Sequence, residues 1–150
     1  MKERRELSFS DYSEVIKEIE TLHGQGYRKG GRWTLSQVCR HLSFYFRGSL
    51  EGFGFQLPWI VRVTIGRWAL NEALKPGTKK PDGGTVKQSL YEPEPDDRAA
   101  VDECIELLKR LQNHRGPLYP SALFGDLTIE QWKRVHLNHA AHHLGFLLRP

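Results

Sequence analysis

The sequence predicts an all-α fold: a four-helix bundle with a long crossover between the second and third long helices that carries a short extra helix. Four long stretches repeat apolar residues every three or four positions, which is the period of amphipathic helices. Two capping boxes, at residues 34–37 and 128–131, mark helix starts. The length of 150 residues indicates a single domain over 1–150, large enough to bury a core.

Charge and cysteine content exclude several classes of protein. The net charge of +4 is mild, and no basic run carries interleaved aromatics, so we expect no nucleic-acid partner. The charged start is not followed by an apolar segment, and no apolar stretch is long enough to span a bilayer, so we expect neither a signal peptide nor a membrane. Cys39 and Cys104 both fall in helical patterns. We expect two free, buried thiols in a cytoplasmic protein, with a disulfide or a reactive thiol as the alternative.

The first two helices are predicted from their ends. Ser8 or Ser10 can cap a helix over 12–22, which ends at residues 23–24. The glycine-rich stretch 24–31 is predicted to be a loop. Thr34 then opens a second helix that runs to about Leu50.

The crossover and the third long helix follow. Pro58 suits the first turn of a short, mostly apolar helix over 59–70, stopped by residues 76–77, although its β-branched part leaves a strand as the alternative. Residues 78–95 are predicted to be a loop, either a lid or a plain linker. Asp96 or Asp97 caps the third long helix, which ends near residue 113.

The last helix, predicted over 128–148, concentrates four of the seven histidines in eight residues. Because a helix turns about 100° per residue, His139 and His143 lie within about 40° of each other. His136 lies about 60° from His139 on the same apolar face. His142 points about 60° the other way, toward the polar side.

Three imidazoles on an apolar face bring ring nitrogens that need partners in a dry environment. One metal ion satisfies several of them at once, and a pair at i and i+4, such as His139 and His143, can bind a single ion. The third ligand we predict is His41, at the inner edge of the second helix. His136 is the reserve ligand, or a residue that orients a ligand. The alternative is that these histidines are packed core residues.

Three motifs resemble a known family. Residues 33–42 (WTLSQVCRHL) and 138–145 (NHAAHHLG) resemble the DinB/YfiT-like superfamily of metalloenzymes, and 124–132 (FGDLTIEQW) resembles a branch known only as a domain of unknown function. The resemblance implies a four-helix bundle in which His41, His139 and His143 bind a divalent metal. It also implies transfer of low-molecular-weight thiols such as bacillithiol or mycothiol, or a thiol-dependent isomerisation. Leu144 and Phe146 replace the Arg and Gln of the family's usual ending.

Together these observations predict a divalent-metal-binding bundle, either a thiol transferase or a hydrolase, that acts on a small molecule such as a low-molecular-weight thiol. Imidazole ligands suit zinc, nickel or iron. Tyr45, one turn after His41, could reach the site, and a core position is its alternative. Two further hypotheses remain: a non-enzymatic bundle that binds a ligand or partner, and a homodimer whose apolar interface includes Trp59 and Trp68.

Overall fold

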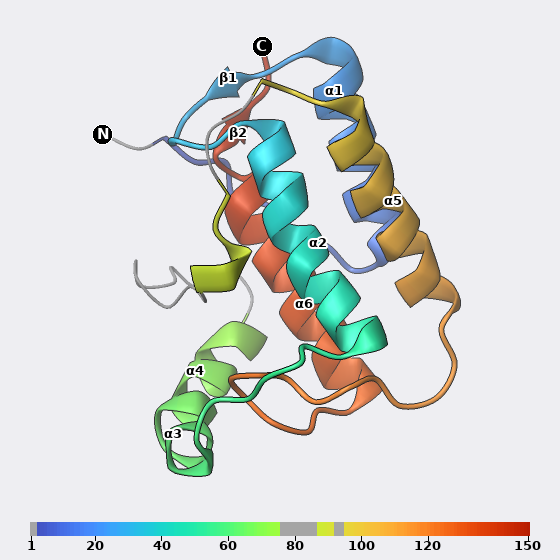
Figure 1. Cartoon of the computed structure of the whole chain (residues 1–150). Helices are drawn as coiled ribbons and strands as arrows, with labels where there is room; N and C mark the ends of the chain where they lie inside the picture. Colours follow the sequence, from blue (N-terminus) through green and yellow to red (C-terminus); the bar gives the residue numbers. More distant parts are fainter. Residues whose placement is uncertain (1–2, 76–86, 92–94) are drawn as a thin grey trace.

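A computed structural model of the chain describes residues 3–75, 87–91 and 95–150 (Figure 1). The described residues form mainly helices, which confirms the predicted all-α class. These are α1 (Tyr12–Gln25), α2 (Leu35–Glu51), α3 (Trp59–Val63), α4 (Ile65–Leu74), α5 (Arg98–Asn113) and α6 (Ile129–Leu144). A 3-10 turn, η1 (Lys87–Ser89), and two short strands, β1 (Arg28–Lys29) and β2 (Leu147–Leu148), complete them.

The four long helices α1, α2, α5 and α6 pack on one another, and α2 and α6 lie side by side at the centre of the view (Figure 1). Helix α5 contacts both α1 and α2. It lies on the opposite side of α2 from α6 (Figure 1). The inward faces of all four helices supply one continuous apolar core. The short helices α3 and α4 lie to one side of this group, where α4 packs against α6.

Both predicted capping boxes are present. The Thr34 hydroxyl accepts from the Gln37 backbone N–H at 3.2 Å, and the Gln37 side chain accepts from the Thr34 N–H at 3.0 Å. The same reciprocal pair joins Thr128 and Gln131 at 3.0 Å in each direction. Each box satisfies two N–H groups that a helix start otherwise leaves unpaired, which explains why these starts were predictable.

The remaining long helices differ in how they begin. Asp97 caps α5, since its carboxylate accepts from the Ala99 N–H at 2.9 Å. The residue before α1 is Asp11, not Ser8 or Ser10 as predicted. Its carboxylate accepts from the Ser13 hydroxyl at 2.6 Å and makes no capping bond to the backbone, so this start has no cap for the sequence to reveal.

The crossover contains two short helices where the sequence predicted one, and the strand alternative is wrong. Helix α3 ends and α4 begins around Thr64, whose φ of −109° and ψ of −89° lie outside the helical region. Its hydroxyl donates to the Ile60 carbonyl at 2.5 Å, a local bond that competes with regular helix geometry. Of the predicted loop 78–95, residues 78–86 and 92–94 lie outside the described residues.

The last helix ends at Leu144 and not at Leu148 as predicted. Residues Leu147 and Leu148 form β2, which pairs antiparallel with β1, inside the stretch 24–31 that was predicted to be a loop. Both leucines are buried, so the apolar pattern was sound, although their backbone is extended. The pairing joins segments about 120 residues apart in the sequence and provides partners for backbone polar groups. Because each strand has only two residues, the sequence contains no strand period to detect.

Cys39 on α2 and Cys104 on α5 are both free and buried, as predicted. A hydrogen bond with Cys104, together with burial, raises the pKa of the Cys39 thiol well above its usual range. The thiolate is the reactive form of cysteine, so the structure supports a packing role for this pair. None of the helices in the described part of the chain combines the length and apolarity needed to cross a membrane.

The two ends of the chain are fastened to α1 through Glu18. Its buried carboxylate accepts from the Arg5 and Arg149 guanidinium groups, the latter at 2.7 Å. Arg5 also donates to the Leu147 carbonyl at 2.9 Å, so the same cluster supports β2. Burial raises the pKa of Glu18, but the two arginine hydrogen bonds outweigh it, and the net pKa is lowered.

We predict that Glu18→Gln lowers the free energy of unfolding by about 2 kcal/mol, because it removes two charge-assisted hydrogen bonds from a buried group. Urea unfolding at pH 7 measures this loss. Glu20→Gln is the matched control, since it makes the same charge change at an exposed position of α1. Equal stabilities of the two variants would contradict the role assigned to Glu18.

His136 is a neutral core residue. Its ring is 1% exposed, stacks on Trp132 at 4.7 Å between ring centroids, and lies edge-on to Phe46. The Ser49 hydroxyl donates to the Phe46 carbonyl at 2.9 Å, so it accepts from His136 Nε2 at 2.9 Å. Burial lowers the pKa of His136 to about 3.

This shift makes stability depend on pH. Below pH 6.5 the unfolded chain protonates this histidine while the folded chain does not, so stability is lost as pH falls from 6.5 toward 3. At pH 5 the loss from this one residue is about 2 kcal/mol. Urea unfolding measures the free energy of unfolding at pH 7 and at pH 5. The decrease between these two pH values should be about 2 kcal/mol smaller in His136→Phe than in the wild type. The same difference in wild type and variant would contradict a depressed pKa.

Candidate metal centre

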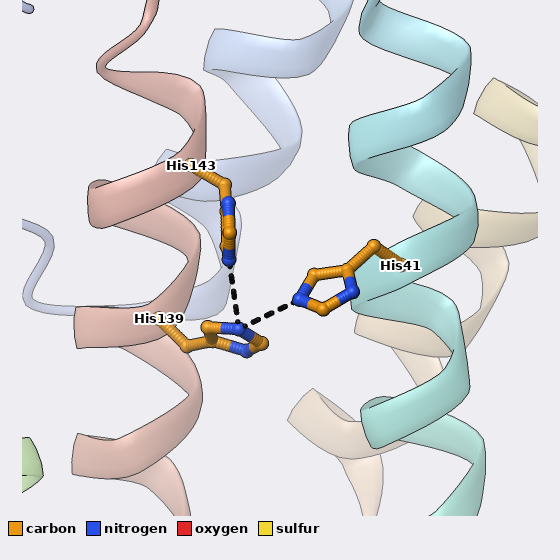
Figure 2. Close-up of side chains that lie close together, drawn as sticks. All are labelled: His41, His139 and His143. Atoms are coloured by element: carbon orange, nitrogen blue, oxygen red, sulfur yellow. Dashed lines mark hydrogen bonds between the residues drawn. The ribbon is translucent and has the colours of Figure 1, made fainter. Parts of the chain in front are cut away.

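The structure brings the three predicted ligands together (Figure 2). His41 comes from α2, and His139 and His143 come from successive turns of α6. The His139 Nε2 atom lies 3.0 Å from His41 Nε2 and 3.1 Å from His143 Nε2. Each residue offers a ligand atom, and these atoms all lie within 4.8 Å of one another. Among the described residues they form a three-histidine group suited to a metal ion.

The two Nε2–Nε2 distances, 3.0 and 3.1 Å, fit a shared ion. Two nitrogens bound to zinc at about 2.0–2.1 Å are about 2.8–3.4 Å apart when the angle between them is about 90–110°. Hydrogen bonding explains the same contacts less well. A single Nε2 atom carries either a proton or a lone pair, so His139 Nε2 cannot donate to one neighbour and accept from the other.

The protonation of His41 is set by its surroundings. Its Nδ1 lies 2.8 Å from the Ser89 carbonyl oxygen, which can only accept, so Nδ1 carries the proton. Burial lowers the pKa of His41 to about 4, although the Ser89 bond works in the opposite direction. The ring is therefore neutral at pH 7, and the Nε2 lone pair is directed at His139. A neutral imidazole with a free lone pair is the form that binds a metal.

Aromatic rings surround the three histidines. The Trp33 ring stacks on His143 with centroids 5.1 Å apart and an interplanar angle of 13°, and it also contacts His41. Tyr45 lies edge-on to His139 at 4.8 Å and to His41 at 5.2 Å. The Tyr45 ring therefore lies beside two of the three imidazoles, and its hydroxyl lies 3.2 Å from the Ser89 hydroxyl. These contacts restrict the orientations of the imidazoles, which is how neighbouring side chains preorganise metal ligands.

The other histidines of the last helix lie outside the three-ligand group. His136, the reserve ligand, directs its Nε2 to Ser49 instead. His142 packs edge-on against His143 at 4.9 Å and against Phe146 at 5.5 Å. His114, beyond the end of α5, lies 3.2 Å from the Pro117 carbonyl oxygen through Nε2.

Sequence reasoning missed the contributions of Ser89 and Trp33. Trp33 directly precedes the capping Thr34, so its ring is fixed by a helix start that was recognised. A helical wheel, however, says nothing about a residue before the helix. Ser89 follows no periodic pattern, and it acts on His41 through its backbone carbonyl, which every residue type has. No signal in a single sequence could have identified it.

Comparison with known proteins gives one partial relative. A segment of 43 residues is 40% identical to the transcription antitermination protein NusB of Frankia casuarinae. This segment covers 29% of the present chain and 32% of the relative, so the match spans about a third of either protein. No solved structure matches the chain.

A family match covers the whole chain. Residues 1–150 match the family described as "Protein of unknown function (DUF1569)". This agrees with the resemblance of residues 124–132 to a domain of unknown function. Because the match extends over residues 1–150, the three histidines and the helices that hold them all lie within it. The chain therefore belongs to the DUF1569 family of proteins of unknown function.

Proposed function

We propose that this chain is a DinB/YfiT-like four-helix bundle that binds one divalent metal ion through His41, His139 and His143 and acts as a thiol transferase or a hydrolase. The observation that carries the proposal is the convergence of three imidazole nitrogens from two helices. The fixed tautomer of His41 supports it, since the lone pair of its Nε2 points into the group. The packing of α1, α2, α5 and α6 around one core supports the bundle.

Three histidine ligands are the usual number for a catalytic metal site, in which further positions stay open for water or substrate. Neutral imidazoles leave the ion's full charge uncompensated, which favours an anionic ligand such as a thiolate. When bound, zinc, nickel or iron would supply Lewis acidity and lower the pKa of a thiol or water molecule at the open position. The buried free cysteines fit a cytoplasmic location, where thiols stay reduced.

The burial of the ligands indicates the side from which a substrate would reach the site. His41 is buried, whereas His139 and His143 are only half-buried, so access from solvent is on the side of the two α6 ligands. Trp33 and Tyr45 are also half-buried and contact the ligand rings. We propose that these two aromatic side chains contact the body of a small-molecule substrate whose reactive group faces the three histidines.

The competing hypothesis is a non-enzymatic bundle in which the histidines are only packed. His136 shows what a packed histidine looks like in this protein, with a hydrogen bond to Ser49 and ring contacts on Trp132 and Phe46. The three-histidine group differs, because its ring nitrogens face one another. His139 Nε2 lies close to both neighbouring Nε2 atoms and cannot donate to one and accept from the other, whereas one cation can bind all three nitrogens, which favours the metal.

Elemental analysis of the purified protein tests the proposal. We predict one zinc, nickel or iron per chain in the wild type, and no stoichiometric metal in His139→Ala or His143→Ala. His41→Ala should weaken binding by at least about tenfold, the loss seen even for residues that only orient a ligand. His142→Ala is the matched control on the same helix and should bind metal normally.

Two results would contradict this assignment. One is a wild-type protein that binds none of the three metals even when they are supplied. The other is a His142→Ala variant as damaged as His139→Ala. Either result would favour the packed-histidine hypothesis.

We also propose that the apolar face of α3 and α4 joins two copies of the chain. Trp59 is 66% exposed and Trp68 is 58% exposed, and three further large apolar side chains are exposed on the same two helices: Ile60, Val63 and Ile65. An exposed apolar group of this size on a soluble domain usually marks an interface. An isologous contact would bury the same side chains from both copies.

Sedimentation velocity tests the dimer. We predict a wild-type mass of twice the 17.3 kDa protomer and a protomer mass for the double variant Trp59→Ser, Trp68→Ser. Tyr119→Ser is the control, because Tyr119 is a similarly exposed aromatic residue outside α3 and α4. A monomeric wild type at concentrations of tens of micromolar, or dissociation by the control variant, would contradict the proposed interface.

A further inference from the structure

One face of α2 holds both a proposed metal ligand and a distant segment of the chain. Gln37, His41 and Tyr45 are spaced four residues apart, so they lie one above another on this face. The Gln37 amide donates to the Tyr91 carbonyl at 3.2 Å, and His41 Nδ1 donates to the Ser89 carbonyl at 2.8 Å. The Tyr45 and Ser89 hydroxyls are 3.2 Å apart. Successive turns of α2 therefore bind residues 89–91.

The contact between His41 and Ser89 is buried, and the other two contacts are partly buried. Ser89 is fully buried, Gln37 is 3% exposed and His41 is 1% exposed. A buried polar group that loses its partner costs more free energy than the same group at the surface. Gln37 is also fixed at its other end, because its side-chain oxygen accepts from the Thr34 N–H in the capping box. The segment is therefore attached to a rigid helix start and not to a mobile side chain.

We propose that residues 89–91 are an outer support of the metal centre, and that metal binding and docking of this segment on α2 stabilise each other. The inference rests on the proposed metal site. The link is the His41 ring, which has the Ser89 carbonyl on one nitrogen and the three-histidine group on the other. A cation at Nε2 withdraws electron density from the ring and makes the Nδ1 proton a stronger donor to the carbonyl.

The coupling also acts in the opposite direction. The carbonyl fixes the ring's orientation and tautomer and increases the basicity of Nε2, which strengthens the bond to the metal. By thermodynamic linkage, the factor by which docking raises metal affinity equals the factor by which metal raises docking. Gln37 and Tyr45 act one step further out, as positioning residues. Each holds residues 89–91 where the Ser89 carbonyl meets His41.

The test compares two variants of the same capping box. Gln37→Ala removes the side-chain bond to the Thr34 N–H and the bond to the Tyr91 carbonyl, whereas Thr34→Ala removes the other bond of the box and leaves the Tyr91 bond in place. Zinc affinity is measured by competition with a chelator. We expect Gln37→Ala to weaken zinc binding by about tenfold and Thr34→Ala to change it less than about twofold. Equal losses in both variants would assign the effect to the helix start and overturn the inference.

A second measurement reads the docking itself. In the wild type, zinc should slow amide hydrogen exchange at residues 89–91, and this protection should shrink in Gln37→Ala. A merely structural segment would exchange at the same rate with and without zinc. A third outcome is that the wild type binds zinc, Gln37→Ala binds zinc with the same affinity, and zinc does not change the exchange at residues 89–91. The proposed support would then be wrong, and the metal site would stand. If the wild type binds no metal, both proposals fail.

Tyr45→Phe and Ser89→Ala keep the inference testable should Gln37→Ala not fold. Both remove the hydroxyl contact between Tyr45 and Ser89, and both retain the tyrosine-like ring against His139 and the Ser89 carbonyl. If the hydroxyls act through each other, the double variant should lose no more zinc affinity than either single variant. Additive losses, or unchanged affinity in all three, would overturn the role of this contact.

Discussion

The packing of α2 against α6 is the contact on which the candidate site depends. His41 and His139 are 98 positions apart in the chain, and their ring nitrogens meet only because these two helices lie side by side. Fully buried Leu42 and Ala140 follow the two histidines directly and belong to the same core. The hydrophobic burial that stabilises the core therefore also places the ligands. The two histidines of α6 alone would lack the third ligand.

Burial alone does not make a histidine a ligand, as His41 and His136 demonstrate. Both rings are almost completely buried, and burial lowers the pKa of each, so both are neutral at pH 7. They differ in which ring nitrogen is hydrogen-bonded to a serine. His136 directs Nε2 to Ser49, whereas His41 uses Nδ1 on a carbonyl and directs Nε2 at the His139 imidazole. The direction of the lone pair, set by the other nitrogen's partner, separates the two roles.

The sequence predicted the features that follow a periodic or capping pattern and missed those that leave no such pattern. The capping boxes at Thr34 and Thr128 fixed the starts of α2 and α6, and helical spacing then placed His139 and His143 on one face. His41 could be selected because its position within α2 followed from the same start. The pairing of β1 with β2 and the break at Thr64 could not be predicted, because each rests on a few contacts that leave no period in the sequence.

The part of the predicted loop 78–95 that the structure describes argues against a plain linker there. Ser89 supplies a carbonyl to His41, and Tyr91 supplies one to Gln37, so the backbone of this segment is used as a hydrogen-bonding surface. Backbone acceptors depend on the path of the chain and little on residue type. The identity of residue 89 therefore matters less for the His41 tautomer than the side chains on α2 that hold the segment in place, which is why Gln37 and not Ser89 is the position at which the support is most easily broken.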